Sequence, residues 1–258
     1  PTGGIRKKRS SQGDTRAKRL MAILHGYTLE DRRELLALIG ELLAGVVPRY
    51  RKLAEEGRGE LSVTPYAHPL LIDTAVPHEA LPEAPLPATG RYPGGRERVL
   101  WHIDEGLRVF EKYFGFRPKG CWPSEGSLSE DTLTLLVDSG FHWTASGETV
   151  LRNSLHRSEA SSHGCIHHPY RLDRQPLTCF FRDDGLSDLI GFSYADWHAE
   201  DAVTNFIHHL ENIAAACRHE PNRVVSVIMD GENAWEHYPE NGYHFLEVMF
   251  HVKQIIIC

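Results

Sequence analysis

Carboxylates gather directly after an apolar run near the end of the chain. The run 224–229 is mostly β-branched or apolar, which predicts a buried strand. Asp230, Glu232 and Glu236 follow it at once, with Trp235 among them. In α/β folds the residues at the carboxyl ends of parallel strands line the ligand crevice. Asp230 is therefore a candidate for acid–base chemistry, although an Asp-Gly pair also commonly caps a turn.

A second carboxylate, Glu125, lies in the run 120–126, which predicts a very short strand and a tight loop before a helix. The positive end of a helix dipole favours the ionised form of Glu125. The acidic neighbours of Asp230 instead favour its protonated form. Such a pair of carboxyl groups supplies the nucleophile and the general acid that a retaining glycosidase needs. The simpler alternative is that Glu125 is only a favourable charge at the start of a helix.

Trp122 and Trp235 lie close to the two carboxylates in the sequence. Aromatic rings suit the faces of sugars, which present C–H groups to them, so both tryptophans are candidate substrate contacts. A retaining pair also requires a short separation. The carboxyl groups of Glu125 and Asp230 are therefore expected to lie about 5–5.5 Å apart, whereas about 6.5–9.5 Å would indicate an inverting enzyme.

Strands and helices alternate along the chain that positions these residues. Apolar periodicity predicts helices at 28–57 with a break near Pro48, and at 96–117, 127–140, 199–218 and 243–249. Strands are expected at 60–64, from 120 onward, and at 141–145, 177–181 and 224–229. The stretches 77–95 and 151–170 are expected to be irregular. This order predicts an α/β fold with a parallel sheet or barrel.

Four of the predicted strands end in polar loops. These loops carry His68, Glu125, the pair Arg182 and Asp183, and Asp230. Because the carboxyl ends of parallel strands meet at the same edge, we expect these side chains to converge on one cleft. For Arg182 and Asp183 the alternative is a local ion pair at the rim of the cleft.

The composition is that of an ordinary globular domain. The 258 residues are 41% hydrophobic and 24% charged, and no apolar run has the length of a membrane span. Residues 1–20 hold seven Lys or Arg and one acidic residue, and are expected to be a disordered basic leader. The net charge of −7 then rests on an acidic remainder, which argues against a nucleic-acid partner. Five scattered cysteines without a C-x-x-C pair predict a reduced, cytoplasmic protein.

Four blocks of the chain, in this order, resemble glycoside hydrolase family 57, the group of α-amylases, amylopullulanases and 4-α-glucanotransferases. The blocks are 64–71, 120–127, 181–192 and 227–236. The resemblance implies a (β/α)7-type barrel, a retaining mechanism and α-glucan substrates without an obligatory metal. It also implies that Glu125 is the nucleophile and Asp230 the acid/base. His68, Arg182 and Asp183 are implied to contact sugar hydroxyls, and Glu232 to lie in the same site.

The chain also departs from the family pattern. No His-Gln-Pro block precedes residue 21, and the chain ends soon after the last block. Only five strands are predicted where the barrel has seven, so residues 21–258 are expected to form an incomplete barrel domain. One hypothesis is therefore a retaining hydrolase or transglycosylase, and another is a truncated, inactive remnant that binds glucan.

A third hypothesis is a metal-dependent hydrolase of the polysaccharide deacetylase kind on a similar barrel. His163, Cys165, His167 and His168 carry atoms that can bind zinc. Their spacing matches no established ligand pattern, which favours an ordinary polar loop. We therefore expect no metal and no other cofactor.

Overall fold

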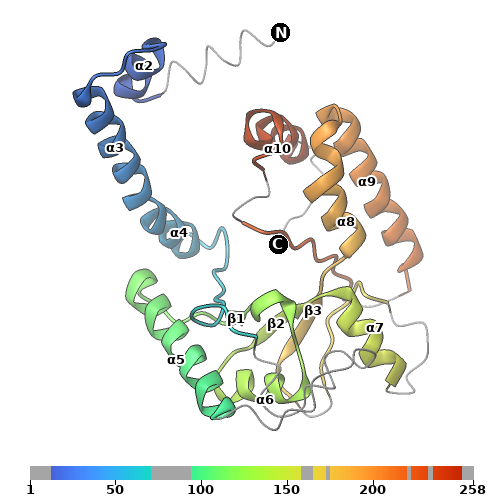
Figure 1. Cartoon of the computed structure of the whole chain (residues 1–258). Coiled ribbons are helices and arrows are strands. Elements are labelled where there is room, and N and C mark those ends of the chain that lie inside the picture. The colour runs from blue at the N-terminus through green and yellow to red at the C-terminus, as the bar shows by residue number, and fades with distance from the viewer. Residues whose placement is uncertain are drawn as a thin grey trace, which may run out of the picture. The chain divides into compact units, whose positions relative to one another are not determined.

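The structure is a computed structural model that describes residues 13–70, 94–157, 165–172, 175–219, 222–231 and 235–251 (Figure 1). The chain divides into two compact units, Pro1–Glu60 and Leu61–Cys258. The boundary expected from the sequence lay at residue 20. The first unit extends further because residues 15–55 form three helices that pack on one another in chain order.

The first unit consists of α2 (Thr15–Ala22), α3 (Leu29–Ala44) and α4 (Val46–Glu55). The last residues of the expected leader are therefore helical. Guanidinium–carboxylate pairs of 2.8 Å join α2 to α3, from Arg16 to Glu41 and from Arg19 to Asp31. The break near Pro48 is confirmed, because α4 begins at Val46 and places Pro48 in its first turn. At that position the missing N–H costs no helical hydrogen bond.

Three parallel strands form the sheet of the second unit: β1 (Gly120–Cys121), β2 (Trp143–Ser146) and β3 (Thr178–Phe181), in that order. Single parallel bridges extend the sheet on both sides, from Val63 to Cys121 and from Arg182 to Ser226. The predicted α/β class with parallel strands is confirmed. The strands expected at 60–64 and 224–229 are shorter than predicted. Each is reduced to one bridge where it meets the outermost regular strand.

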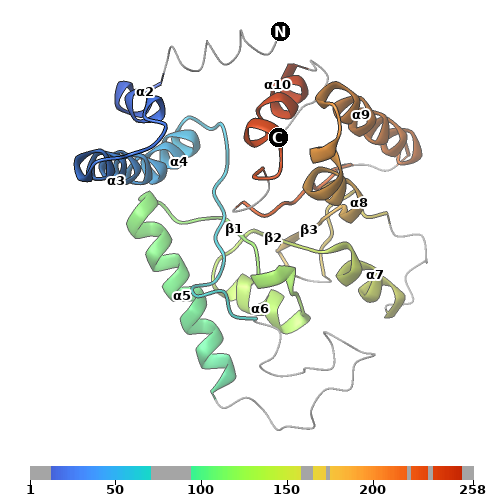
Figure 2. The same ribbon diagram turned by 45° about the horizontal axis from the view of Figure 1, so that its top comes forward.

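The sheet packs against α5 (Gly95–Phe114), α6 (Glu130–Asp138) and α7 (Glu148–Arg157), as Figures 1 and 2 show. Their apolar faces form one core with the strands, including Ile103, Leu136, Leu151 and Cys179. The irregular structure expected over 151–170 is wrong for the residues of α7. The buried Leu151 and an Arg152–Glu148 hydrogen bond of 2.6 Å one turn apart stabilise this helix.

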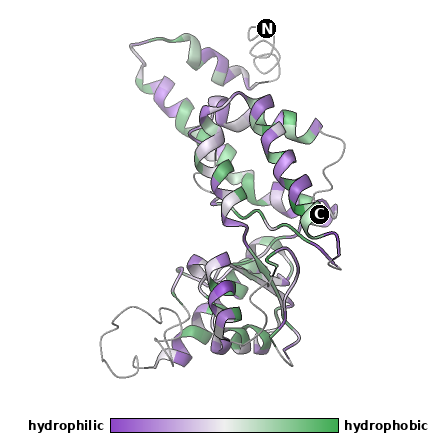
Figure 3. Ribbon diagram, turned by 90° about the vertical axis from the view of Figure 1, so that its right-hand side faces the viewer, coloured by the Kyte–Doolittle hydropathy of each residue, from purple (hydrophilic) through white to green (hydrophobic). Residues whose placement is uncertain are grey.

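A second core lies among the helices that follow β3. These are α8 (Asp184–Asp188), single turns at Leu189–Ser193 and Tyr194–Asp196, α9 (Ala199–Ala216), a turn at Pro239–Gly242 and α10 (Tyr243–His251). Ile190, Tyr194, Val203, Phe206 and Phe245 are buried in this core. Hydrophobic and hydrophilic residues are interleaved along these helices (Figure 3). In α9 the buried residues Ala202, Val203 and Phe206 recur at the spacing of one helical face. Among the described helices, none combines the length and the apolar character needed to cross a membrane.

Candidate active site

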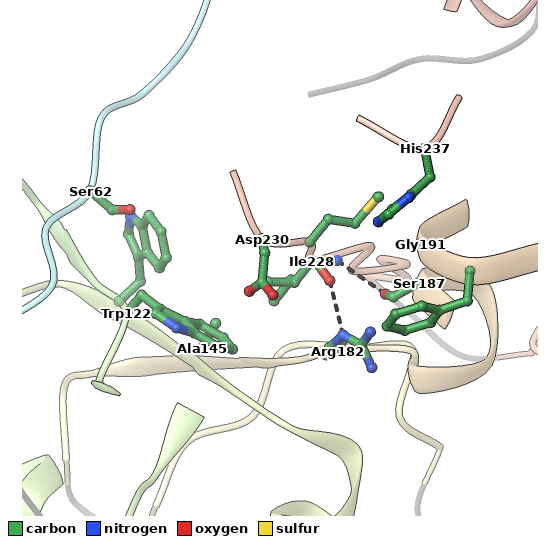
Figure 4. A pocket seen from close by; sticks show the side chains of 12 residues that line it. Ser62, Trp122, Ala145, Arg182, Ser187, Gly191, Ile228, Asp230 and His237 are labelled. Carbon is green, nitrogen blue, oxygen red and sulfur yellow. Dashed lines mark hydrogen bonds between the residues drawn. The ribbon is translucent and has the colours of Figure 1, made fainter. Parts of the chain in front are cut away.

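A pocket of about 560 Å³ opens at the carboxyl end of the sheet (Figure 4). Aromatic side chains and one carboxylate share its lining, a combination that suits a sugar ring with polar substituents. The lining residues are Ser62, Trp122, Trp143, Ala145, Arg182, Ser187, Gly191, Phe192, Ile228, Met229, Asp230 and His237. Of the residues predicted from the sequence, the pocket thus brings together Trp122, Arg182 and Asp230.

Asp230 reaches the pocket from an extended segment that is fixed to the end of β3. The Asp183 N–H donates to the Ser226 carbonyl at 2.8 Å, and Arg182 Nε donates to the Ile228 carbonyl at 2.9 Å. The Ile228 N–H donates to Ser187 Oγ at 3.2 Å. These three bonds hold Ser226 and Ile228, which lie shortly before Asp230 in the chain. The carboxylate of Asp230 is directed into the pocket in Figure 4.

Glu125 lies in a tight turn that β1 and its neighbours fix. Its φ of +57° is in the left-handed region, which is strained for a residue with a Cβ. Thr64 Oγ1 donates to the Trp122 carbonyl at 3.1 Å, and Ser146 Oγ donates to the Gly126 carbonyl at 2.5 Å. A hydroxyl next to the Val63 bridge and a hydroxyl of β2 therefore bind the backbone on the two sides of this turn.

The side chain of Glu125 is 73% exposed and is not part of the pocket lining. Its Oε1 lies 3.9 Å from Nδ1 of His68, another strand-end residue with a positive φ, +55°. The structure thus places two of the predicted site residues beside each other. Both project from strained loops, which are common where side chains are held for function.

Arg182 and Asp183 have local partners. The Arg182 guanidinium lines the pocket, but its two terminal nitrogens bind Asp184 at 2.7 Å and Asp188 at 2.6 Å. Asp183 is buried and caps α8 by accepting the Leu186 N–H at 2.8 Å. The His167 ring lies 2.9 Å from its other oxygen. Burial by itself raises the pKa of Asp183, but the hydrogen bonds from His167 and Leu186 outweigh burial and hold the pKa below its usual value.

Trp235 packs in the second core. Its ring lies 5.3 Å from the Tyr238 ring and 6.0 Å from the Phe245 ring, measured between centroids. Gly242 approaches it so closely that an added Cβ would lie 2.6 Å from the indole. Packing thus accounts for Trp235. Glu232 lies outside the described residues.

Sequence reasoning missed several pocket residues. Trp143 and Ala145 belong to β2, whose predicted strand drew attention for its apolar pattern alone. Phe192, which is 78% exposed, closes the third of the four sequence blocks. His237 directly follows the fourth block. Membership of a block, or adjacency to one, was the signal that could have identified Phe192 and His237.

One cluster among the described residues could hold a metal ion, and it lies outside the pocket lining. It consists of Cys165, His167 and Cys217. Two of the four residues considered as zinc ligands from the sequence thus take part. His168 instead stacks on the Tyr170 ring, and His163 lies outside the described residues.

The His68–Glu125 contact leads to a prediction. Replacing His68 with Ala should lower kcat/KM on a glucan substrate about 10- to 100-fold, because the Glu125 carboxylate loses the ring that lies 3.9 Å from it and helps to hold it in position. The melting temperature should barely change, since the side chain is half exposed. His142→Ala, at another exposed histidine of the same unit, serves as the control. A large fall in melting temperature at unchanged activity would assign His68 to stability.

The chain is similar to known proteins in sequence and in fold. The profile of Glycosyl hydrolase family 57 matches residues 10–254. No curated protein sequence matches significantly. A branching enzyme of Pyrococcus horikoshii shares the fold with a TM-score of 0.59 at 13% identity, over 96% of this chain and 51% of that one.

Two further solved structures share the fold. The α-amylase AmyC of Thermotoga maritima has a TM-score of 0.62 at 13% identity, over 91% of this chain and 55% of that chain. A 4-α-glucanotransferase of Thermococcus litoralis has a TM-score of 0.55 at 22% identity, over 84% and 29%. The chain thus spans about half, or less, of each of these proteins. Since the family profile covers nearly all of its sequence, this chain belongs to glycosyl hydrolase family 57.

Proposed function

We propose that this chain carries the catalytic face of a retaining α-glucan hydrolase or transglycosylase. The observation that carries the proposal is the pocket, in which Trp122 and Asp230 meet although more than one hundred residues separate them. Each comes from a different block of the family pattern. Aromatic walls beside a carboxylate suit an α-glucan, whose sugar faces stack on rings while its glycosidic oxygen needs a proton. The scattered cysteines support a cytoplasmic location.

In the proposed mechanism Glu125 attacks the anomeric carbon while Asp230 protonates the departing glycosidic oxygen. The glycosyl–enzyme ester is then cleaved by an acceptor whose hydroxyl proton passes to Asp230. Water as acceptor gives hydrolysis, and the hydroxyl of a second glucan chain gives transfer. Trp122 supplies the stacking surface in this scheme, and His68 orients the Glu125 carboxylate across the 3.9 Å contact.

A second candidate function is glucan binding without turnover. The exposed position of Glu125 outside the pocket lining favours it, because a nucleophile must reach the sugar held in the pocket. In this alternative Trp122 and the other aromatic residues bind the polymer, and Asp230 is only a hydrogen-bond acceptor.

The two candidates separate in a paired assay on the purified chain with soluble starch. We expect release of reducing ends, or redistribution of chain lengths when maltooligosaccharides are added, and loss of both in Asp230→Ala. Asp201→Ala, at an exposed carboxylate in the first turn of α9, is the matched control and should keep both. Starch binding without turnover would establish the binding function instead. Absence of both starch binding and turnover would refute both candidates.

A further inference from the structure

Two cysteines and a histidine meet at the carboxyl end of α9, and none of the three lines the pocket. Cys165 and Cys217 are 52 positions apart in the sequence, and their sulfur atoms lie 3.2 Å apart. Nδ1 of His167 lies 3.8 Å from each sulfur. Cys217 is buried, and the other two residues are partly buried. A chain without a C-x-x-C pair thus assembles two sulfurs and one ring nitrogen by folding.

The three atoms are spaced for one metal ion. A single point can lie about 2.3 Å from both sulfurs and about 2.05 Å from the ring nitrogen, which are the bond lengths of zinc to cysteine and histidine. The sulfur–sulfur distance of 3.2 Å is shorter than the roughly 3.7 Å that tetrahedral zinc geometry gives. Separation of the sulfurs by about half an ångström would complete the geometry.

The orientation of His167 is the second observation that points to a ligand. Its Nε2 lies 2.9 Å from Oδ2 of the buried Asp183, so the proton on that nitrogen is donated to the carboxylate. In this tautomer Nδ1 carries the lone pair, and Nδ1 is the nitrogen that lies near both sulfurs. Metal-binding histidines are held in this manner, with the second ring nitrogen on a carboxylate.

The backbone favours a thiolate at Cys165 and a cation at Cys217. The His167 N–H lies 3.4 Å from Cys165 Sγ and can donate to that sulfur. Cys217 immediately follows α9, and its own N–H donates to the Ile213 carbonyl at 2.9 Å. The carboxyl end of a helix carries partial negative charge, which stabilises a cation bound there.

We propose that Cys165, His167 and Cys217 bind a zinc ion, with a water molecule or another donor in the fourth position. The site differs in place and in kind from the proposed glucan pocket and does not rest on that function. It departs from the expectation, drawn from the sequence, that the chain uses no metal. Its role is structural: it ties the end of α9 to the segment 165–168 and, through Asp183, to the end of β3.

This role reaches the segment that carries Asp230. The Val224 N–H donates to the His167 carbonyl at 2.9 Å, and the Asp183 N–H donates to the Ser226 carbonyl at 2.8 Å. His167 and its partner Asp183 thus both also hold the segment 224–226. Zinc bound at this site would make the segment 224–226, which leads to Asp230, more rigid without contacting a substrate.

A disulfide between the two cysteines is the competing chemistry. It would require the sulfurs to close from 3.2 Å to about 2.05 Å, with loss of two electrons to an oxidant. It would also leave Nδ1 of His167 without the thiolates that it faces. The zinc proposal uses all three side chains, whereas the disulfide uses only two.

The test is the metal content and the thermal stability of the purified chain, prepared under reducing conditions. We expect about one zinc per chain by elemental analysis, a melting temperature that falls on chelation, and its recovery when zinc is added back. Cobalt(II) added to the metal-free chain should give the intense near-ultraviolet band of thiolate-to-cobalt charge transfer. These measurements on the unmodified chain decide the proposal even where a variant fails to fold.

Variants locate the site. Cys217→Ser and Cys165→Ser should each weaken zinc binding at least 100-fold, more than the 10- to 100-fold loss that a supporting residue causes. Cys179→Ala, at a buried cysteine in β3 outside the cluster, is the matched control and should bind zinc like the unmodified chain. Absence of zinc together with no cobalt band, or a Cys165–Cys217 disulfide found by mass spectrometry in the reduced preparation, would overturn the proposal. Equal loss in Cys179→Ala would overturn it too.

Discussion

Replacing Glu125 with Gln should lower turnover of soluble starch by roughly 10⁴- to 10⁶-fold, the range seen when an essential catalytic group is removed. The amide keeps the size and the hydrogen-bonding reach of the side chain but cannot form the glycosyl ester. The folded state should keep its stability, because the side chain is 73% exposed. The measurement is the initial rate of reducing-end release, with the melting temperature recorded for each variant.

Azide adds a specific signature to this prediction. In Glu125→Ala the space left by the carboxylate admits a small anion, which attacks the anomeric carbon directly and releases a glycosyl azide of inverted configuration. Azide should therefore restore part of the activity of Glu125→Ala with an inverted product, whereas any glycosyl azide formed by a variant in the acid arises from the glycosyl–enzyme ester and keeps the configuration of the substrate. Glu130→Gln is the matched control, since Glu130 is exposed, lies five residues further on and opens α6. Full activity in Glu125→Gln would remove Glu125 from the mechanism.

Replacing Asp230 with Ala should produce a loss that depends on the leaving group. Starch has a poor leaving group that needs a proton, so we expect its cleavage to fall about 10²- to 10⁴-fold, the usual contribution of general acid catalysis. An activated aryl maltoside needs little protonation, so its first step should be much less affected. The ratio of kcat/KM on the two substrates is the quantity to compare.

Glu232 is the rival for the role of acid, and the same experiment separates the two. Asp230 is placed in the pocket lining by the bonds that fix residues 226 and 228, which favours it as the acid. Glu232→Ala should therefore show a small loss of equal size on both substrates. A dependence on the leaving group in Glu232→Ala, and not in Asp230→Ala, would transfer the acid role to Glu232.

The α/β class and many of the elements were determined by the sequence, although α2 and α7 were not expected. Apolar residues repeat with a period of two or of 3.6 within single segments, and these local repeats predicted β3, α5 and α9 to within a few residues. The same holds for the break at Pro48, which depends on one residue's missing N–H. The four blocks placed Trp122, Arg182 and Asp230 at strand ends, and all three line one pocket.

Tertiary structure alone decided how the polar side chains are used. Asp183 and Arg182 are neighbours in the sequence, yet one is buried as a helix cap with His167 as its partner and the other faces the pocket. Trp235 lies among the acidic residues 230–236 but packs on Phe245, because a large ring gains more from burial in the nearby core. The partner available to each polar group depends on segments far away in the sequence.

The cluster of Cys165, His167 and Cys217 shows most clearly that contacts between distant segments cannot be predicted from local sequence patterns. Metal-ligand motifs are recognised when the ligands lie a few residues apart, whereas here the second sulfur comes from the end of α9, 52 positions later.

The two strands expected at the edges of the sheet are reduced to single bridges for a related reason. A strand needs hydrogen-bonding neighbours along its length, and local periodicity determines the pattern of a strand but not how many neighbours it meets.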